Sequence, residues 1–325
     1  MLRKELVSTI IPVFNRPRML REAVESVLGQ SYRPIEIVIV DDGSTDETPS
    51  VADDIQRQNG ELVKVLHMAN CGPGLARESG RRAVTGEFVQ YLDSDDLLLR
   101  DKFELQVNDL RRNPDCGISY CKTRYRDPTG NVVTDAWKRT GETIRTLFPS
   151  MLLSRWWATS TPLYRRSVVE SVGPWSDLTN EEDWEYDCRV GARGIELHFV
   201  PETLLEVRGH QEGRASDNGV ADPSKLASRA RAHEMIHRHA VAAGIEPAVP
   251  EMQHFSRELF LLSRQCGAAG LVDASRRLFE LSRESSSSHH WAGLDYLVYG
   301  AGARVVGWRV MGKASEHLDR IRNLV

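Results

Sequence analysis

The sequence has little of what marks a membrane-spanning or a polyanion-binding protein. Among its 325 residues there is no run of 18 uncharged apolar residues, which argues against a spanning helix. The formal net charge of −4 is small for this length, so attraction of the whole surface to nucleic acid is not expected. With 41% hydrophobic and 27% charged residues, the chain has the composition of an ordinary globular protein.

Cysteine is also scarce. The five cysteines form no CxxC pair and no Cys/His spacing typical of zinc sites, and an odd number fits poorly with a disulfide framework. A reducing, cytoplasmic setting is therefore expected. The amino-terminal segment MLRKELVSTIIPV has a basic start, but its apolar run is short, ends at Pro12 and has no cleavage site. We interpret it as a first strand.

Two glycine-rich phosphate-binding motifs, GxGxxG and GxxxxGK[ST], are absent, so neither a Rossmann dehydrogenase nor a P-loop NTPase is supported. What the first 120 residues do contain is a regular alternation. Apolar runs predict strands at 8–13, 35–40, 62–67 and 87–92. Helical spacing predicts helices at 17–30, 45–58 and 74–84, the second capped by Ser44 or Thr45. This order predicts an α/β fold with a mostly parallel sheet and helices on both faces.

Beyond residue 114 the alternation weakens. The pattern predicts a hairpin turning at 127–130, helices at 162–173 and 181–194, and a strand at 195–208. From about residue 222 the composition shifts to Ala, Arg, Leu and Ser with helical periodicity. We therefore predict a boundary near 215–222, which separates an α/β domain (1–218) from a C-terminal α-helical region (219–325).

The C-terminal region is expected to serve packing or oligomerisation. Its segment 291–311 is interpreted as a helix pair packed on the rest of the protein. The alternative is a helix at a membrane surface, with four aromatic and three basic residues at the interface: Trp291, Tyr296, Tyr299, Trp308, Arg304, Arg309 and Lys313.

Three aspartates within four residues are the most unusual feature of the chain. In QYLDSDDLLL, residues 90–99, Asp93, Asp95 and Asp96 follow an apolar run. Like charges this close repel by about 1 kcal/mol per pair even in water, so a cation is expected to offset the repulsion. Mg²⁺ and Mn²⁺ prefer carboxylate oxygens. We predict a divalent metal site at Asp93 and Asp95, with Asp96 capping the next helix. A cap alone is the alternative, but it needs only one aspartate.

Polar residues also follow the other predicted strands, and in open sheets ligands bind beyond the carboxyl ends of the strands. Asp41 and Asp42 follow the second strand, and one of them is a candidate for a hydrogen bond to a nucleobase or ribose. A plain turn with a helix cap is the alternative. Arg77, in the first turns of the helix after NCGPG, suits a phosphate or a base, with a solvated arginine as the alternative.

Three later features have two interpretations each. The acidic stretch NEEDWEYDCR, residues 180–189, is by itself explained as well by a solvated helix face as by a site. His210, in RGHQ, is by default a solvated loop histidine. Trp156 and Trp157 could stack on a sugar ring or pack in the core.

Four motifs, taken in order, resemble the inverting glycosyltransferases of family 2, which have the GT-A fold: IIPVFNRPRMLREAVESVLGQSY, IEIVIVDDGSTDET, GPGLARESGRRAVTGEFVQYLDSDD and EEDWEYDCRVGARG. The resemblance covers about residues 6–215. It implies a GT-A nucleotide-diphospho-sugar transferase fold with a helical appendage. It further implies metal-assisted transfer of a sugar from a nucleotide sugar to an acceptor hydroxyl by a single displacement, in polysaccharide or glycoconjugate synthesis.

The resemblance also implies roles for individual residues. Asp93 and Asp95 match the DxD pair that holds Mn²⁺ or Mg²⁺, His210 falls near that metal, and Asp183 matches the catalytic base. The nucleotide sugar would be bound by the following residues: Pro12, Val13, Phe14, Asn15, Asp41, Arg77 and Ser94. The implied partners are a nucleotide-diphosphate sugar and a carbohydrate or lipid-linked acceptor, without nucleic acid. A cytoplasmic protein with peripheral contact to the inner face of the membrane fits this chemistry.

Two other functions remain open at this point. A sugar-nucleotide pyrophosphorylase has the same general architecture and also uses carboxylates and a metal. It would be expected to carry a glycine-rich loop with Arg and Lys where this chain has PVFNRP. A nucleotide-sugar-binding protein without catalysis is the second alternative, and the presence of Asp93, Asp95 and Asp183 argues against it.

Overall fold

The computed structural model describes residues 2–209, 222–286 and 294–322. The chain forms two compact units: one contains residues 1–146, 156–177 and 194–214, and the other contains 147–155, 178–193 and 215–325. The predicted division into 1–218 and 219–325 stays a prediction, because most of the segment 215–222 lies outside the described residues. Two short segments that sequence reasoning placed in the α/β domain, 147–155 and 178–193, belong to the second unit.

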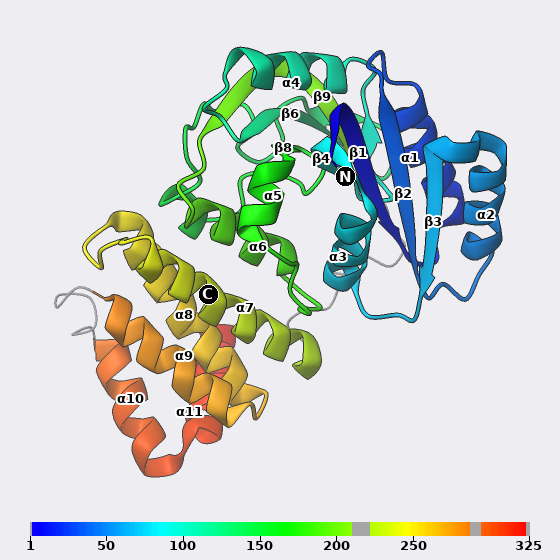
Figure 1. The fold of residues 1–325 in the computed structure, drawn as a ribbon. Helices are drawn as coiled ribbons and strands as arrows, with labels where there is room; N and C mark the ends of the chain where they lie inside the picture. The colour runs from blue at the N-terminus through cyan, green and yellow to red at the C-terminus, as the bar shows by residue number, and fades with distance from the viewer. Residues whose placement is uncertain (1, 210–221, 287–293, 323–325) are drawn as a thin grey trace. The chain divides into compact units, whose positions relative to one another are not determined.

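The first unit is built on one mixed sheet with the strand order β3-β2-β1-β4-β8-β6-β9-β5, and β7 pairs with β6 (Figure 1). The strands are β1 (Arg3–Val13), β2 (Ile35–Asp42), β3 (Val63–Met68), β4 (Gly86–Tyr91), β5 (Leu97–Leu98), β6 (Ile118–Arg126), β7 (Val132–Thr134), β8 (Leu163–Arg165) and β9 (Leu197–Arg208). β1 to β4 are parallel, as are β6 and β9, while β8 is antiparallel to both β4 and β6. The carboxyl ends of β1, β2 and β4 therefore meet at one edge of the sheet, called the carboxyl edge below.

Helices cover both faces of this sheet, as predicted. They are α1 (Pro17–Leu28), α2 (Thr48–Asn59), α3 (Pro73–Ala83), α4 (Lys102–Arg112) and α5 (Arg166–Val172). The alternation of side chains along β1 sorts them: Val7 and Ile11 join the core formed with α1, α2 and α4. Ile10 points to the other face, where α3 approaches so closely that a Cβ at Gly80 would lie 2.3 Å from Ile10 Cγ2. α3 and α5 lie in front of the sheet in Figure 1.

Three local expectations were wrong. α2 begins at Thr48, with Glu47 at the N-cap position, rather than after a Ser44 or Thr45 cap. α4 has Asp101 at its N-cap, so Asp96 does not cap it. The segment 162–173 is not one helix but β8 followed by α5, because its first residues pair with β4 and β6. The hairpin at 127–130 is confirmed by the antiparallel pairing of β6 with β7.

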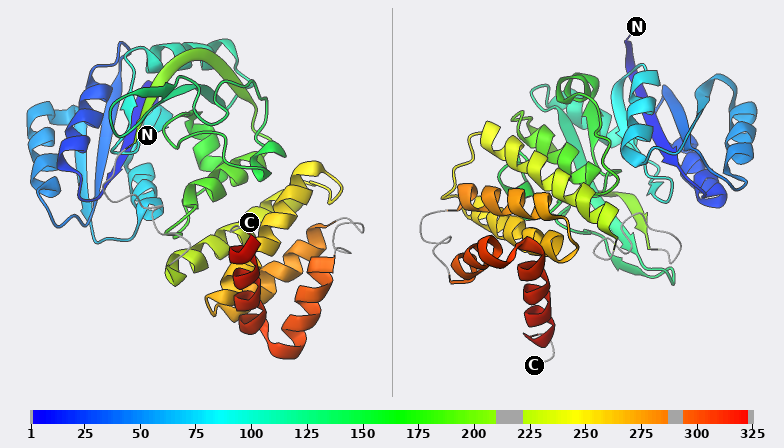
Figure 2. Two further views of the ribbon diagram at one scale, coloured as in Figure 1. Left: turned by 180° about the vertical axis from the view of Figure 1, so that it is seen from behind. Right: turned by 90° about the horizontal axis from the view of Figure 1, so that it is seen from below.

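The second unit is helical. It contains the 3-10 turn η2 (Ser150–Leu152) and the helices α6 (Glu182–Gly191), α7 (Pro223–Ala242), α8 (Pro250–Ala268), α9 (Val272–Ser285), α10 (Leu294–Val306) and α11 (Trp308–Arg322). Figure 2 shows α10 and α11 joined as a hairpin beside α8 and α9. Where α11 crosses α8, a Cβ at Gly312 would lie 2.2 Å from the backbone nitrogen of Ala268, so this approach requires glycine.

An aromatic cluster holds the hairpin to the other helices. Its buried members are Phe260 of α8, Phe279 of α9, and Tyr296 and Tyr299 of α10, with Trp308 and Met311 packed against them. The predicted helix pair is therefore confirmed for residues 294–311, and it packs on α8 and α9 of its own unit. The alternative with aromatic side chains at a membrane is wrong for Tyr296 and Tyr299, which are buried; Trp291 lies outside the described residues. In the described part of the chain, every helix is too short or too polar to cross a membrane.

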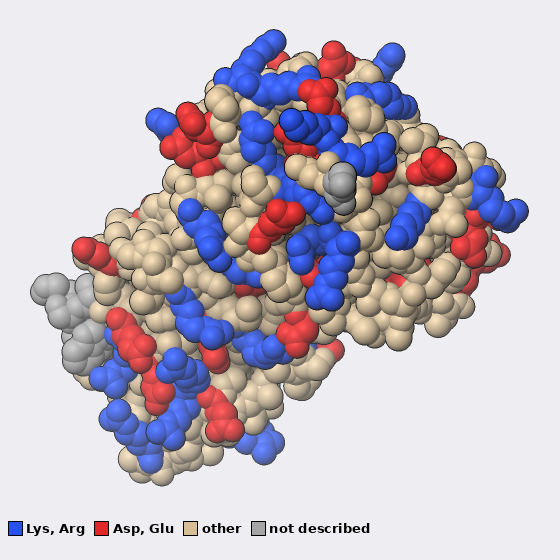
Figure 3. All heavy atoms as spheres, viewed as in Figure 1, with Lys and Arg blue, Asp and Glu red and all other residues tan. Residues whose placement is uncertain are grey.

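Charges are mixed over the surface. On the face drawn in Figure 3, lysine and arginine alternate with aspartate and glutamate. This distribution agrees with the small net charge of −4.

Candidate active site

The exits of β1 and β2 are tied together at the carboxyl edge. β1 delivers four predicted site residues there: Pro12 and Val13 at its end, then Phe14 and Asn15. Asn15 has a left-handed φ of 51°, which asparagine tolerates well. Its N–H donates to Ser44 Oγ at 2.9 Å, and its amide oxygen accepts from Thr45 N at 2.8 Å. Ser44 and Thr45 thus tie the turn after β2 to the exit of β1 instead of capping a helix.

Asp41 is the penultimate residue of β2, in register with Val13 of β1 and His67 of β3, and its side chain is buried. One carboxylate oxygen accepts from Ser44 N at 3.1 Å, and the other lies 3.0 Å from His67 Nδ1. His67 Nε2 lies 3.0 Å from Asp53. These hydrogen bonds to Asp41 and Asp53 raise the pKa of His67 against the opposing effect of burial. Asp41 is therefore a carboxylate in a fixed orientation beside a titratable ring.

Asp42 has a structural task. Its carboxylate accepts hydrogen bonds from Cys71 N at 2.8 Å and Gly72 N at 2.9 Å, which shapes the loop before α3. Burial raises its pKa despite these bonds. The next residue, Gly43, has a φ of +73°, and a Cβ there would lie 2.6 Å from Asn70 N, so only glycine fits. The turn thus separates a candidate ligand group, Asp41, from a loop anchor, Asp42.

The turn after β4 presents two of its three aspartates to basic side chains. Asp93 accepts a hydrogen bond from Arg77 Nη2 at 2.8 Å, and Asp95 accepts one from Arg16 Nη1 at 2.6 Å. The two aspartate side chains are 29% and 19% exposed. Ser94 between them is buried. Each member of the DxD pair is thus matched by an arginine from a different element.

The third aspartate holds the turn in place. Asp96 is buried, and its carboxylate accepts a hydrogen bond from Ser160 Oγ at 2.7 Å. The same Ser160 oxygen accepts from Asp93 N at 3.0 Å, and Arg208 Nε donates to the Asp95 carbonyl at 2.7 Å. Burial raises the pKa of Asp96 well above its usual value, and the charges of Asp95 and Asp93 add to the effect. Asp96 is therefore an anchor for the turn.

Arg77 is held from behind by an aromatic ring. It is buried, and its guanidinium carbon lies 4.9 Å from the centre of the Trp175 ring, which packs edge-on against Tyr91. A cation over an aromatic face is stabilised without being neutralised, so Arg77 keeps its charge for an anion. Trp175 therefore supports the predicted nucleotide-binding arginine.

The donor set of the turn fits a divalent cation that is shared with a substrate. Asp93 and Asp95 provide hard oxygen ligands. Among the described residues, no three His, Cys, Asp or Glu side chains are grouped so as to hold a metal. Mg²⁺ is usually bound by one or two carboxylates together with substrate phosphates and water, which agrees with a two-carboxylate site. His210 lies outside the described residues, and its place near the metal stays a prediction.

In the second unit, Asp183 lies in the first turn of α6, where a helix stabilises negative charge. Its Oδ2 accepts a hydrogen bond from Arg155 Nη1, and its Oδ1 accepts from Trp184 N at 2.7 Å. Arg155 Nε donates to Asp187 at 2.7 Å. Asp183 is 28% exposed, but Asp187 only 2%. The buried Asp187 therefore holds Arg155 in place, and Arg155 in turn fixes the orientation of the accessible Asp183.

Apart from Glu181, whose side chain is 20% exposed, the rest of the acidic stretch is buried, so its interpretation as a solvated helix face was wrong. Glu182, Glu185 and Asp187 are all buried. Glu185 is bonded to His239 at 2.9 Å and to Arg189 at 3.0 Å. Burial would raise its pKa, but these partners outweigh burial and lower it. Most of these carboxylates therefore stabilise the interior of the second unit.

Sequence reasoning missed the basic and hydroxyl partners of these carboxylates. They are Arg16, His67, Arg155, Ser160 and Arg208. Only Arg16 carried a signal, because it lies inside PVFNRP at a strand exit. The others lie far from their partners in the sequence, and no local pattern reveals such a pairing. Trp156 and Trp157 are 2% and 0% exposed, so they pack in the core and do not present a stacking surface.

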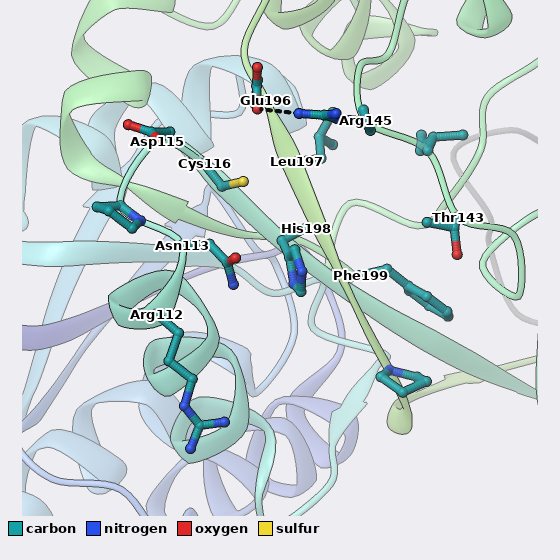
Figure 4. A pocket seen from close by; sticks show the side chains of 13 residues that line it. Arg112, Asn113, Asp115, Cys116, Thr143, Arg145, Glu196, Leu197, His198 and Phe199 are labelled. Carbon is teal, nitrogen blue, oxygen red and sulfur yellow. Dashed lines mark hydrogen bonds and ion pairs between the residues drawn. The ribbon is translucent and has the colours of Figure 1, made fainter.

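A separate cavity of about 480 Å³ lies at the other edge of the sheet, at the amino ends of β6 and β9. Figure 4 shows its mixed polar and apolar lining, in which Arg145 and Glu196 form an ion pair and His198 and Cys116 face the space. The Arg145 and Glu196 side chains are 3.3 Å apart. None of the predicted site residues is among the described residues that line it. The carboxyl edge remains the candidate donor site.

A mixed α/β sheet with helices on both faces and a DxD turn at its carboxyl edge defines the class: a glycosyltransferase of the GT-A type. The solved structures agree on the fold. Residues 1–349 of S. aureus TarS in complex with UDP-GlcNAc match with a TM-score of 0.68 and 18% identity, over 96% of this chain and 91% of that one. The mannosyltransferase PcManGT from Pyrobaculum calidifontis, in complex with GDP-Man and Mn²⁺, matches with a TM-score of 0.54 and 19% identity, over 94% of this chain and 83% of that one.

Sequence comparisons define the family. The profile described as glycosyl transferase family 2 matches residues 8–172. An uncharacterized glycosyltransferase of Nostoc sp. is 36% identical over 240 residues, 72% of this chain and 74% of that protein. A glycosyltransferase of Rickettsia felis is 40% identical over 107 residues, which span 33% of this chain but only 17% of that protein. The chain belongs to glycosyl transferase family 2. This membership decides against the pyrophosphorylase alternative.

Proposed function

We propose that the protein transfers a sugar from a nucleotide-diphosphate sugar to an acceptor hydroxyl with inversion at the anomeric carbon. The observation that carries this proposal is the pairing of Asp93 with Arg77 and of Asp95 with Arg16 at the carboxyl edge. Two carboxylates for a cation and two guanidinium groups for an anion are the groups that a metal-bound diphosphate requires. The UDP-GlcNAc bound by TarS and the GDP-Man and Mn²⁺ bound by PcManGT support a donor of this class.

In this proposal the donor lies across the exits of β1, β2 and β4. Asp41 accepts a hydrogen bond from the base, and Pro12 to Asn15 line the nucleotide. Asp93 and Asp95 would hold Mn²⁺ or Mg²⁺, and the bound ion would offset charge on the departing diphosphate. Arg77 and Arg16 contact the phosphate oxygens, which leaves the two carboxylates for the cation.

Asp183 acts as general base. It takes the proton of the acceptor hydroxyl while the acceptor oxygen bonds to C1 of the sugar. The bond from C1 to the diphosphate oxygen breaks in the same step, and the nucleoside diphosphate leaves with the electron pair. Arg155 holds the carboxylate in one orientation, as a positioning residue. The acceptor is a carbohydrate or a lipid-linked sugar, which places the reaction in polysaccharide or glycoconjugate synthesis.

A panel of nucleotide sugars with Mn²⁺ or Mg²⁺, read by thermal shift and by release of nucleoside diphosphate, tests this function. We expect one donor to raise the melting temperature only with the metal, and Asp95→Ala to lose both the shift and turnover. Asp115→Ala, an exposed aspartate at the opposite edge of the sheet, is the matched control. An equal shift in Asp95→Ala and wild type would contradict the metal assignment. Binding of a donor with no turnover on any acceptor would favour a non-catalytic binding protein.

A further inference from the structure

The outward side of α10 is apolar. Leu297, Val298 and Val305 are 50%, 61% and 84% exposed, on the side of the helix away from the aromatic cluster. Ala301, one turn after Leu297, is exposed with them, and Val306 and Val310 continue the apolar surface into α11. These six residues are called the aliphatic face. The outward side of a helix normally carries polar residues, so a surface of this kind indicates a contact site.

The charged residues between Asp295 and Glu316, which span most of the aliphatic face, have one sign. Residues 296–315 contain Arg304, Arg309 and Lys313 and no aspartate or glutamate. All three basic side chains are exposed. Arg304 follows Leu297 by two helical turns, so it lies on the same stripe. Asp295, just before this segment, is paired with Arg257 of α8.

We propose that the aliphatic face binds the surface of an anionic lipid bilayer. Aliphatic side chains enter the boundary of headgroups and acyl chains, while Arg304, Arg309 and Lys313 contact lipid phosphates. The basic charge selects this occupant over a second copy of the chain, because a two-fold contact through this face would bring the same three cations together. The binding is interfacial, since α10 and α11 are amphipathic surface helices. It does not depend on the proposed transfer reaction.

Flotation of the full chain with lipid vesicles tests the proposal. Vesicles of phosphatidylcholine alone are compared with vesicles that also contain phosphatidylglycerol. We expect binding to the anionic vesicles to be at least about tenfold stronger and to weaken as salt is added. Val298→Asp with Val305→Asp should reduce it by at least about tenfold. Arg304→Gln, Arg309→Gln and Lys313→Gln should each reduce it by about fivefold, which corresponds to about 1 kcal/mol per charge.

The matched control is Val241→Asp on α7, where the valine is 57% exposed but outside the aliphatic face. It should bind vesicles like the wild type, and circular dichroism should show all variants folded, since the changes are at exposed positions. Equal binding to both vesicle types, or binding that survives the paired aspartates, overturns the proposal. A wild type that does not bind vesicles also overturns the proposal. Such a wild type could be dimeric in light scattering and become monomeric in the Val298→Asp, Val305→Asp variant, which would make the aliphatic face a contact between two copies of the chain.

Discussion

Two acidic segments, DSDD at 93–96 and EEDWEYD at 181–187, both bring several carboxylates close together, and the repulsion between these carboxylates is offset differently in each segment. In the first, the two exposed aspartates take arginines from separate elements, and the buried one, Asp96, is held by a neutral hydroxyl. In the second, one arginine, Arg155, serves both the exposed Asp183 and the buried Asp187. The first arrangement leaves two carboxylates for a cation, while the second fixes one carboxylate as a base.

The comparison of the two segments gives a criterion for assigning roles to carboxylates in an acidic run. Exposure together with the kind of partner separates carboxylates that do chemistry from those that hold the backbone. In both segments the part-exposed aspartates carry the proposed chemistry, and the buried carboxylates are anchors. Glu181, a part-exposed glutamate, pairs with Arg229 instead.

The largest effect is expected for Asp183→Asn. The amide oxygen can still accept from Arg155, whereas the NH2 group in place of the other oxygen cannot accept from Trp184 N. The amide cannot take a proton, so turnover should fall by about 10²–10⁴-fold. Donor affinity and melting temperature should change little. Steady-state rates with and without saturating acceptor, beside a donor titration, separate these quantities. If the variant lost donor affinity and kept its turnover number, Asp183 would be a binding residue and the division between the two segments would be wrong.

Asp187→Asn should act on stability instead. It removes one charge of a buried pair and leaves Arg155, 12% exposed, with half of its compensation. We expect a loss of about 3 kcal/mol in the free energy of unfolding, measured by urea titration. Glu280→Gln is the control, since it breaks an exposed pair with Arg276 on α9 and should cost about 0.5 kcal/mol or less. Equal costs would mean that burial does not distinguish the two classes.

How far the sequence leads can be judged from the same residues. The strands that end at Val13, Asp42 and Tyr91 were predictable because local apolar runs and turn residues decide them. The DxD turn was visible because its charges are adjacent. Ser160 and Arg155 could not be predicted, since each meets its aspartate across 64 and 28 residues of chain. The first residues of the predicted helix 162–173 form β8 because pairing with β4 and β6 overrides their local propensity, while the helix itself begins only at Arg166.

Ser160→Ala tests the neutral anchor. The change leaves Asp96 and Asp93 N without their shared hydroxyl, which should cost about 1–3 kcal/mol of stability and reduce turnover by about tenfold through displacement of the DxD turn. Ser119→Ala is the matched control: Ser119 is equally buried and also donates to an aspartate, Asp109, at 2.6 Å. It should lose similar stability and keep its turnover. If Ser119→Ala lost as much activity as Ser160→Ala, the loss would follow from reduced stability alone and not from displacement of the DxD turn.

The smallest effect is expected at Asp41, the proposed base-binding carboxylate, because its basic partner is a histidine that titrates near neutral pH. Arginine pairings do not change with pH near neutrality, but Asp41 is bonded to His67, whose pKa is raised. A raised folded-state pKa means that this contribution is fully present below the unfolded value of about 6.5 and is lost as the pH rises through the folded value. His67→Gln should therefore be less stable than the wild type in acid, and the gap in urea midpoints should close in mild alkali. His254→Gln, an exposed histidine of α8, should show no such trend. A gap of constant size would mean that the contact with Asp41 is made by a neutral ring, and Asp41 would then resemble the arginine-paired carboxylates in its indifference to pH.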